Sequence, residues 1–137
     1  MSGRVILVTN DASVDRLRPV IRATLPTADL TVLTGRKGVI ETLQDRVTPD
    51  TLLVCFSTGV IIPNTVLSRL KGPAYNFHAA SPEYPGRDPH HFAVYYTAKR
   101  YGATAHEVAA RVDSGRVIGV EWFEVAPSTP PKALREA

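Results

Sequence analysis

The feature that most constrains the fold is an alternation between short apolar runs and amphipathic segments. Val5–Thr9, Leu30–Leu33 and Leu52–Phe56 are largely apolar and β-branched, as expected of strands buried on both faces. Between these runs, apolar residues recur at helical spacing over 14–25 and 39–47. Strand, helix, strand, helix, strand predicts a compact Rossmann-like α/β domain, with a mostly parallel sheet and helices on both faces.

Local signals set the expected ends of these elements. Asp11 or Ser13 is expected to cap the first helix, and Pro19 is expected to kink or split it. Later segments fit a helix, two strands and a final strand that is antiparallel at the sheet edge: Asn64–Leu70, Ala74–His78, Ala103–His106 and Val117–Val125. We expect one catalytic domain over residues 1–126, followed by a tail over 127–137.

Composition excludes several classes of protein. The chain of 137 residues has a net charge of +3 with scattered basic residues, which argues against a nucleic-acid-binding surface. Its single cysteine, Cys55, allows no intrachain disulfide and suits a reducing compartment; it is expected to be a small buried hydrophobe. The first apolar run is too short for a signal peptide, and no segment is long enough to span a membrane. We therefore expect a cytoplasmic protein.

The stretch NFHAASPEYPGRDPHH, residues 76–91, is the most informative part of the chain. Asn76 and His78 are two apart, so they project from the same face of a strand, near its carboxyl end. Three prolines and a glycine then hold the following loop in few conformations. In an open α/β sheet, ligands bind beyond the carboxyl ends of the strands, so this pair is a candidate site. An isolated Asn-x-His pair more often bonds only to loop backbone.

A second candidate element is the turn Arg111–Gly115, which carries one acid, Asp113. An Asp-Ser-Gly sequence is most often only a turn. His90 and His91 are adjacent and diverge, and no regular His, Cys or acid spacing is present, so we expect no metal site.

Together these motifs resemble the 10-formyltetrahydrofolate-dependent formyltransferases over residues 56–125. The resemblance rests on Asn-x-His at a strand end, the Pro/Tyr/Gly-rich loop, the Gly-x-Thr-x-His strand and the Asp turn. It implies a formyltransferase-type fold and the catalytic residues Asn76, His78 and Asp113. It also implies pteridine-binding walls formed by Thr58, Gly59, Val60, Ile61, Arg111 and Val112, with His106 supporting Asp113 or the loop.

The resemblance implies transfer of a formyl group from 10-formyltetrahydrofolate to the amine of a small substrate. Asn76 and His78 would donate hydrogen bonds to the oxyanion of the tetrahedral intermediate, and Asp113 would orient His78 or accept a proton. Hydrolysis of the same folate, or folate or partner binding without turnover, remain alternatives.

Departures from the family pattern narrow the range of expected acceptor substrates. The loop after the first strand, Asn10–Ser13, has no glycine for a phosphate, which disfavours glycinamide ribonucleotide as acceptor. Only a short polar tail follows Pro131, so no tRNA-binding domain is expected. Pairing of the edge strand Val117–Val125 with a second copy would form a homodimer.

Overall fold

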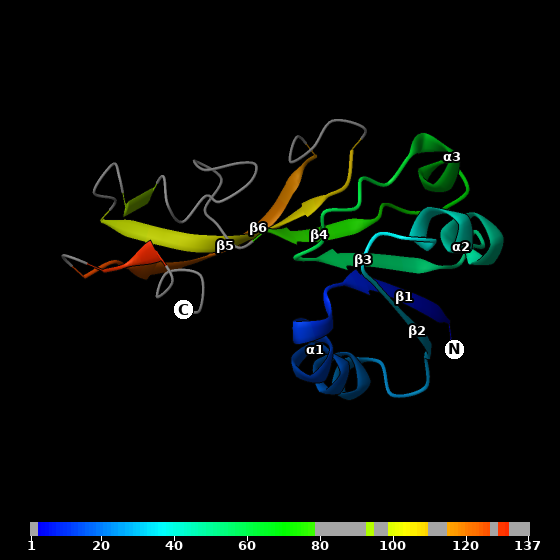
Figure 1. The fold of residues 1–137 in the computed structure, drawn as a ribbon, viewed down its shortest axis with the longest axis horizontal. Coiled ribbons are helices and arrows are strands. Elements are labelled where there is room, and N and C mark those ends of the chain that lie inside the picture. Colours follow the sequence, from blue (N-terminus) through cyan, green and yellow to red (C-terminus); the bar gives the residue numbers. More distant parts are fainter. Residues whose placement is uncertain (1–2, 79–92, 95–98, 110–114, 127–128, 132–137) are drawn as a thin grey trace. The chain divides into compact units, whose positions relative to one another are not determined.

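A computed structural model of the protein describes residues 3–78, 93–94, 99–109, 115–126 and 129–131. The chain divides into two compact units, Met1–Asn76 and Phe77–Ala137. Its strands follow the order β2-β1-β3-β4-β5-β6 in the sheet (Figure 1). Throughout the described ranges, no helix combines the length and apolar character needed to cross a membrane.

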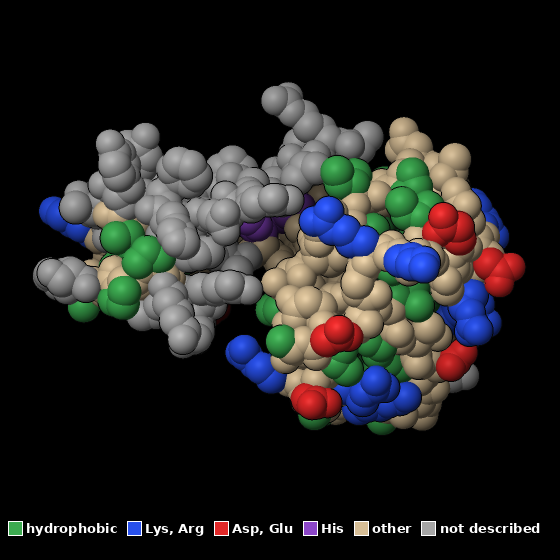
Figure 2. Space-filling view, viewed as in Figure 1, with side chains coloured by type: hydrophobic (Ala, Val, Ile, Leu, Met, Phe, Trp, Pro, Cys, Tyr) green, Lys and Arg blue, Asp and Glu red, His purple; other side chains and the backbone are tan. Residues whose placement is uncertain are grey.

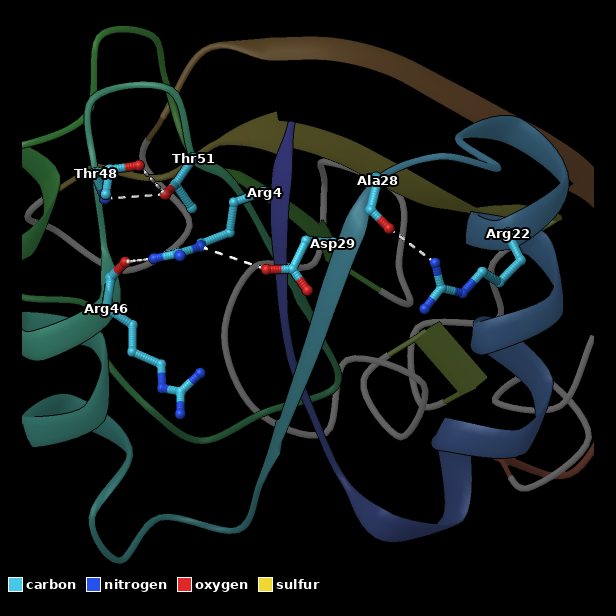
Figure 3. A network of polar contacts seen from close by, with 7 residues as sticks. All are labelled: Arg4, Arg22, Ala28, Asp29, Arg46, Thr48 and Thr51. Carbon is cyan, nitrogen blue, oxygen red and sulfur yellow. Dashed lines mark hydrogen bonds and ion pairs between the residues drawn. The ribbon is translucent and has the colours of Figure 1, made fainter. Parts of the chain in front are cut away.

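The first unit has the predicted alternation of strands and helices. Its elements are β1 (Arg4–Thr9), α1 (Asp11–Thr24), β2 (Asp29–Thr34), α2 (Val39–Arg46), β3 (Leu52–Phe56), α3 (Asn64–Leu67) and the start of β4 (Tyr75–His78). β1 lies between β2 and β3 and pairs in parallel with both, which confirms the predicted parallel sheet. The side chains of Ile6 and Val8 on β1 are completely buried, as are those of Leu43 on α2 and Leu53 on β3. β1 and β2 lie between α1 and α2, so helices cover both faces here (Figures 1 and 3).

Helix α1 differs from the prediction at two points. Its N-cap is Asn10, whose side chain accepts a hydrogen bond from the Ser13 backbone N–H, so neither Asp11 nor Ser13 is the capping residue. Asn10 has the extended backbone of an N-cap and lies three residues before Ser13, the spacing at which a capping side chain meets a backbone N–H of the first turn. The helix also runs through Pro19 without a break. The carbonyl that Pro19 leaves without a helical donor belongs to Asp15, which is exposed, so water can satisfy it.

The amino ends of the strands are held by arginine side chains. Arg4, the first residue of β1, donates to the Arg46 carbonyl at 2.6 Å and lies 3.8 Å from the Asp29 carboxylate at the start of β2 (Figure 3). Arg22 near the end of α1 donates to the Ala28 carbonyl at 2.8 Å, just before β2 (Figure 3). This edge of the first unit is therefore closed by contacts within the chain.

The second unit contains an antiparallel hairpin of β5 (Arg100–Glu107) and β6 (Val117–Glu124). Tyr101 is completely buried, and its ring meets that of Phe123 edge to face at 5.9 Å. The strand expected over Ala103–His106 is longer at both ends: Arg100 to Gly102 also pair with β6, and Glu107 extends it by one residue.

β6 ends the strand order, so the predicted antiparallel edge strand is confirmed. The pairing register shifts between Ala105 and His106, as at a β-bulge. A bulge interrupts the regular edge that a second strand would need. The homodimer stays a prediction.

Candidate active site

The carboxyl ends of the first three strands meet at one edge of the first unit. Thr9, the last residue of β1, lies opposite Thr34, the last residue of β2, and Val8 lies opposite Cys55 on β3. Because these strands are parallel and in register, the loops that follow them begin at the same edge. Ligands of open α/β sheets bind at such an edge.

The loop after β3 is held by two hydrogen bonds. Ser57 has a left-handed backbone, with φ of 49°, which is uncommon for a residue with a side chain. Its carbonyl accepts a hydrogen bond from the Asn10 side-chain amide at 3.0 Å. In the next residue, the Thr58 hydroxyl accepts a hydrogen bond from the backbone N–H of Val60, two positions further on, at 3.1 Å. The loop is therefore preorganised, and backbone strain of this kind tends to occur at functional sites.

This loop contains four of the residues predicted to contact the pteridine, Thr58 to Ile61. Ile62 is buried and fixes the loop to the core, whereas the neighbouring Ile61 is 59% exposed. Gly59 is also exposed. The exposed isoleucine offers apolar surface, which suits a flat aromatic ring. The contact of these loop residues with a pteridine remains a prediction.

Asn76 and His78 lie in β4, as predicted. Both are half-buried, while Phe77 between them is 43% exposed. This alternation is the one expected of a strand, and it places the amide and the imidazole on the same face of β4.

His106, the predicted supporting residue, lies in β5 and is only 5% exposed. Its Nδ1 is 2.9 Å from the backbone oxygen of Glu107. A carbonyl can only accept, so Nδ1 carries the proton and donates. The imidazole is thereby fixed in orientation, as a supporting role requires.

Three predicted site residues, Arg111, Val112 and Asp113, lie outside the described residues. The convergence of Asp113 with Asn76 and His78 therefore stays a prediction.

Two residues at the carboxyl edge were not identified from the sequence. Asn10 bonds to the loop after β3, and Arg36, which follows β2, lies with its guanidinium against Gly59. Neither residue carries a local signal for its contact in the sequence, because a contact between distant loops leaves no local pattern. A small residue such as Gly59 inside an apolar loop is the available signal that another group approaches there.

Cys55 is not a nucleophile at this edge. It is 3% exposed on β3, and burial raises the pKa of its thiol to about 12. The thiolate is the reactive form, so the side chain stays inert near neutral pH. The prediction of a small buried hydrophobe is confirmed.

The strand order and the carboxyl-edge loops define a Rossmann-like α/β protein, a class that binds ligands where these loops meet. Comparison with known proteins identifies the family. The family model described as "Formyl transferase" matches residues 5–137, and the chain belongs to that family.

A relative and two solved structures illustrate the similarity. Methionyl-tRNA formyltransferase of Listeria innocua serovar 6a is 38% identical over 68 residues, which are 49% of this chain and 22% of that protein. Glycinamide ribonucleotide transformylase 1 from Symbiobacterium toebii gives a TM-score of 0.72 at 19% identity, covering 98% of this chain and 79% of that one. The N-formyltransferase from Helicobacter canadensis, in complex with folinic acid and dTDP-3-aminofucose, gives 0.72 at 15% identity, covering 98% of this chain and 57% of that one. The chain thus spans about a fifth of the sequence relative, and the two structures show a shared fold.

Proposed function

We propose that this protein transfers the formyl group of 10-formyltetrahydrofolate to the amine of a small substrate. The observation that supports it most is the placement of Asn76 and His78 on one face of β4, in a chain of the formyl transferase family. The proposed catalytic domain comprises residues 1–126, with Asp113 as the third catalytic residue.

The proposed reaction requires stabilisation of a developing negative charge. The amine nitrogen attacks the formyl carbon, and the carbonyl oxygen becomes an oxyanion. Asn76 donates a hydrogen bond to that oxygen from its side-chain amide, which is neutral and does not titrate. His78 donates a second hydrogen bond or delivers a proton to the departing folate nitrogen as the carbon–nitrogen bond breaks. Asp113 accepts the proton lost by the attacking amine, directly or through water.

The donor is proposed to bind against the loop after β3. The loop is held in place by the Asn10–Ser57 hydrogen bond, and the exposed side chain of Ile61 offers the pteridine an apolar contact. The Helicobacter canadensis relative binds folinic acid, which supports a folate-type donor here. That relative also binds an amino sugar nucleotide, which supports a small amine as acceptor.

The distribution of charge on the surface of the first unit supports a small ligand and not a large polyanion. Over the described residues of the first unit visible in Figure 2, Lys and Arg side chains are interspersed with Asp and Glu. A large polyanion such as RNA is recognised mainly by extended basic surfaces, and that face has none. Phosphate or carboxylate groups on a small acceptor need only one or two cations.

Turnover with and without an amine tests the proposal. The protein is incubated with 10-formyltetrahydrofolate alone and then with a panel of small amines, including amino sugars and glycinamide ribonucleotide. Release of tetrahydrofolate that depends on an amine, with matching formylation of that amine, supports transfer. Equal release without any amine supports hydrolysis instead, and binding without release identifies a non-catalytic folate-binding protein.

A further inference from the structure

We propose that Arg36 recognises an oxyanion, a phosphate or a carboxylate, on the ligand bound at the carboxyl ends of β1, β2 and β3. This inference rests on the proposed function for the identity of the ligand, but the oxyanion site is testable without turnover.

The first observation is the contact between Arg36 and Gly59. A β-carbon at position 59 would lie 2.7 Å from Cζ and 2.8 Å from Nε of Arg36, and closer still to Nη2. Real β-carbons do not approach other atoms so closely, so the guanidinium occupies the space that any side chain at position 59 would need. Gly59 therefore lets a cation settle directly on the loop that is proposed to bind the donor.

The second observation is the hydrogen-bonding state of Arg36. Some arginines have partners, such as Arg4 and Arg22, which donate to backbone carbonyls, whereas others, such as the exposed Arg16, have none within the described ranges. Among the described residues, Arg36 has neither a hydrogen-bond acceptor nor a carboxylate within ion-pair distance. Its side chain is exposed, so its donors face solvent. A guanidinium presents a planar set of donors that matches two oxygens of a phosphate or carboxylate.

The third observation is the backbone around Arg36. Gly35 and Gly38 flank the pair Arg36 and Lys37, both with left-handed backbone at φ of 73° and 76°. Nothing lies within 4 Å of the position of a β-carbon on either glycine. The loop after β2 therefore has open space at the two glycines that flank its cationic pair. The loop after β1, by contrast, has no glycine, and its Asn10 side chain is already occupied by Ser13 and Ser57.

These observations assign oxyanion recognition to the loop after β2 instead of the loop after β1. The oxyanion belongs to one of two ligands. It is either a phosphate or carboxylate of the acceptor, or the glutamyl carboxylate of the folate donor. The absence of glycine in Asn10–Ser13 then does not exclude a phosphorylated acceptor, because the cation comes from the neighbouring loop.

Binding of inorganic phosphate and of 5-formyltetrahydrofolate to the whole chain tests the inference, measured by calorimetry at low salt. The variants are Arg36→Gln, Arg36→Lys and Gly59→Ala, with Lys37→Gln as the control that removes an equal charge from the adjacent residue. We expect Arg36→Gln to weaken binding of the affected ligand about tenfold, the usual effect of losing a charged hydrogen bond. Gly59→Ala displaces the flexible guanidinium and should weaken binding of the same ligand similarly. The double variant Arg36→Gln/Gly59→Ala should lose no more affinity than either single variant.

The two sources give different results. If the oxyanion belongs to the acceptor, phosphate and the folate bind together, and Arg36→Gln weakens phosphate alone. If it belongs to the donor, phosphate competes with the folate, and Arg36→Gln weakens 5-formyltetrahydrofolate but leaves its analogue without the glutamyl group unchanged.

Two results would overturn the inference: undiminished binding of both ligands by Arg36→Gln, or an equal loss in Lys37→Gln, which would indicate unspecific charge attraction. Phosphate binding that depends on Arg36 in a protein that binds no folate would reject the proposed function and leave the oxyanion site standing.

Discussion

Asn10 donates a hydrogen bond from its side-chain amide to the backbone oxygen of Ser57 at 3.0 Å, across 47 positions of sequence. The same side chain accepts the Ser13 N–H at the start of α1. One residue thus joins the loop after β1 to the loop after β3, and Ser57 keeps its left-handed backbone within that contact. The shape of the proposed donor site depends on this pair.

Replacing Asn10 separates its two roles. Asn10→Ala removes the cap and the bridge and should lower the free energy of unfolding by about 2 kcal/mol, roughly 1 kcal/mol for each. Asn10→Ser keeps a capping hydroxyl that is too short to reach Ser57, so it should cost about 1 kcal/mol. Urea denaturation measures both. Both variants should bind 5-formyltetrahydrofolate more weakly, and wild-type binding by Asn10→Ser would show that the bridge does not shape the site.

Asn76→Ala, His78→Ala and Asp113→Ala should each reduce turnover by about a hundred- to a thousandfold, the usual cost of losing an oxyanion donor or its partner. Unfolding midpoints in urea should change little, because Asn76 and His78 are only half-buried. Phe77→Leu is the matched control, since this exposed residue points to the other face of β4. Activity near the wild-type level in any of the three variants would reject that residue as catalytic.

The hairpin of the second unit should be sensitive to a methyl group at one glycine and not at another. A β-carbon on Gly102 would collide with the backbone oxygen of Glu121, whereas nothing lies within 4 Å of the same position on Gly119. Gly102→Ala should cost about 1–3 kcal/mol through overpacking against backbone, and Gly119→Ala should be nearly neutral. Thermal unfolding of the two variants compares them directly. Equal stability would mean that β5 and β6 can separate at Gly102 without loss.

Stability should fall at alkaline pH because of Cys55. Its pKa is raised from 9.0 to about 12 in the folded chain, so between these values the unfolded chain loses the proton and the folded chain keeps it. Below pH 9 the thiol is protonated in both states, and its contribution is constant. Between pH 9 and 12 the free energy of unfolding should fall by up to about 1.4 kcal/mol per pH unit.

Cys55→Ala controls for the other groups that titrate at high pH. The variant has a smaller side chain in the core and should be less stable at pH 7, but its stability should decline less steeply above pH 9. Parallel slopes for the two proteins would show that the thiol does not contribute.

Much of this fold could be predicted from the sequence, because β-branched runs such as Val5–Thr9 and the helical spacing between them are local signals. The placement of Asn76 and His78 on one face of the predicted strand followed from their spacing of two residues. The N-cap was misassigned because Asn10, Asp11 and Ser13 are all good caps, and only backbone geometry separates them. The contact of Arg36 with Gly59 could not be foreseen, since it joins loops whose proximity depends on the strand order.

The central claim is that the carboxamide of Asn76 and the imidazole of His78 activate a folate-bound formyl group for attack by an amine. The most direct test is tetrahydrofolate release from 10-formyltetrahydrofolate by the wild type and by Asn76→Ala, with and without an amine panel. We predict release that requires both an amine and Asn76, with the formyl group recovered on the amine. Release unaffected by Asn76→Ala, or no release and no folate binding by the wild type, would contradict the claim.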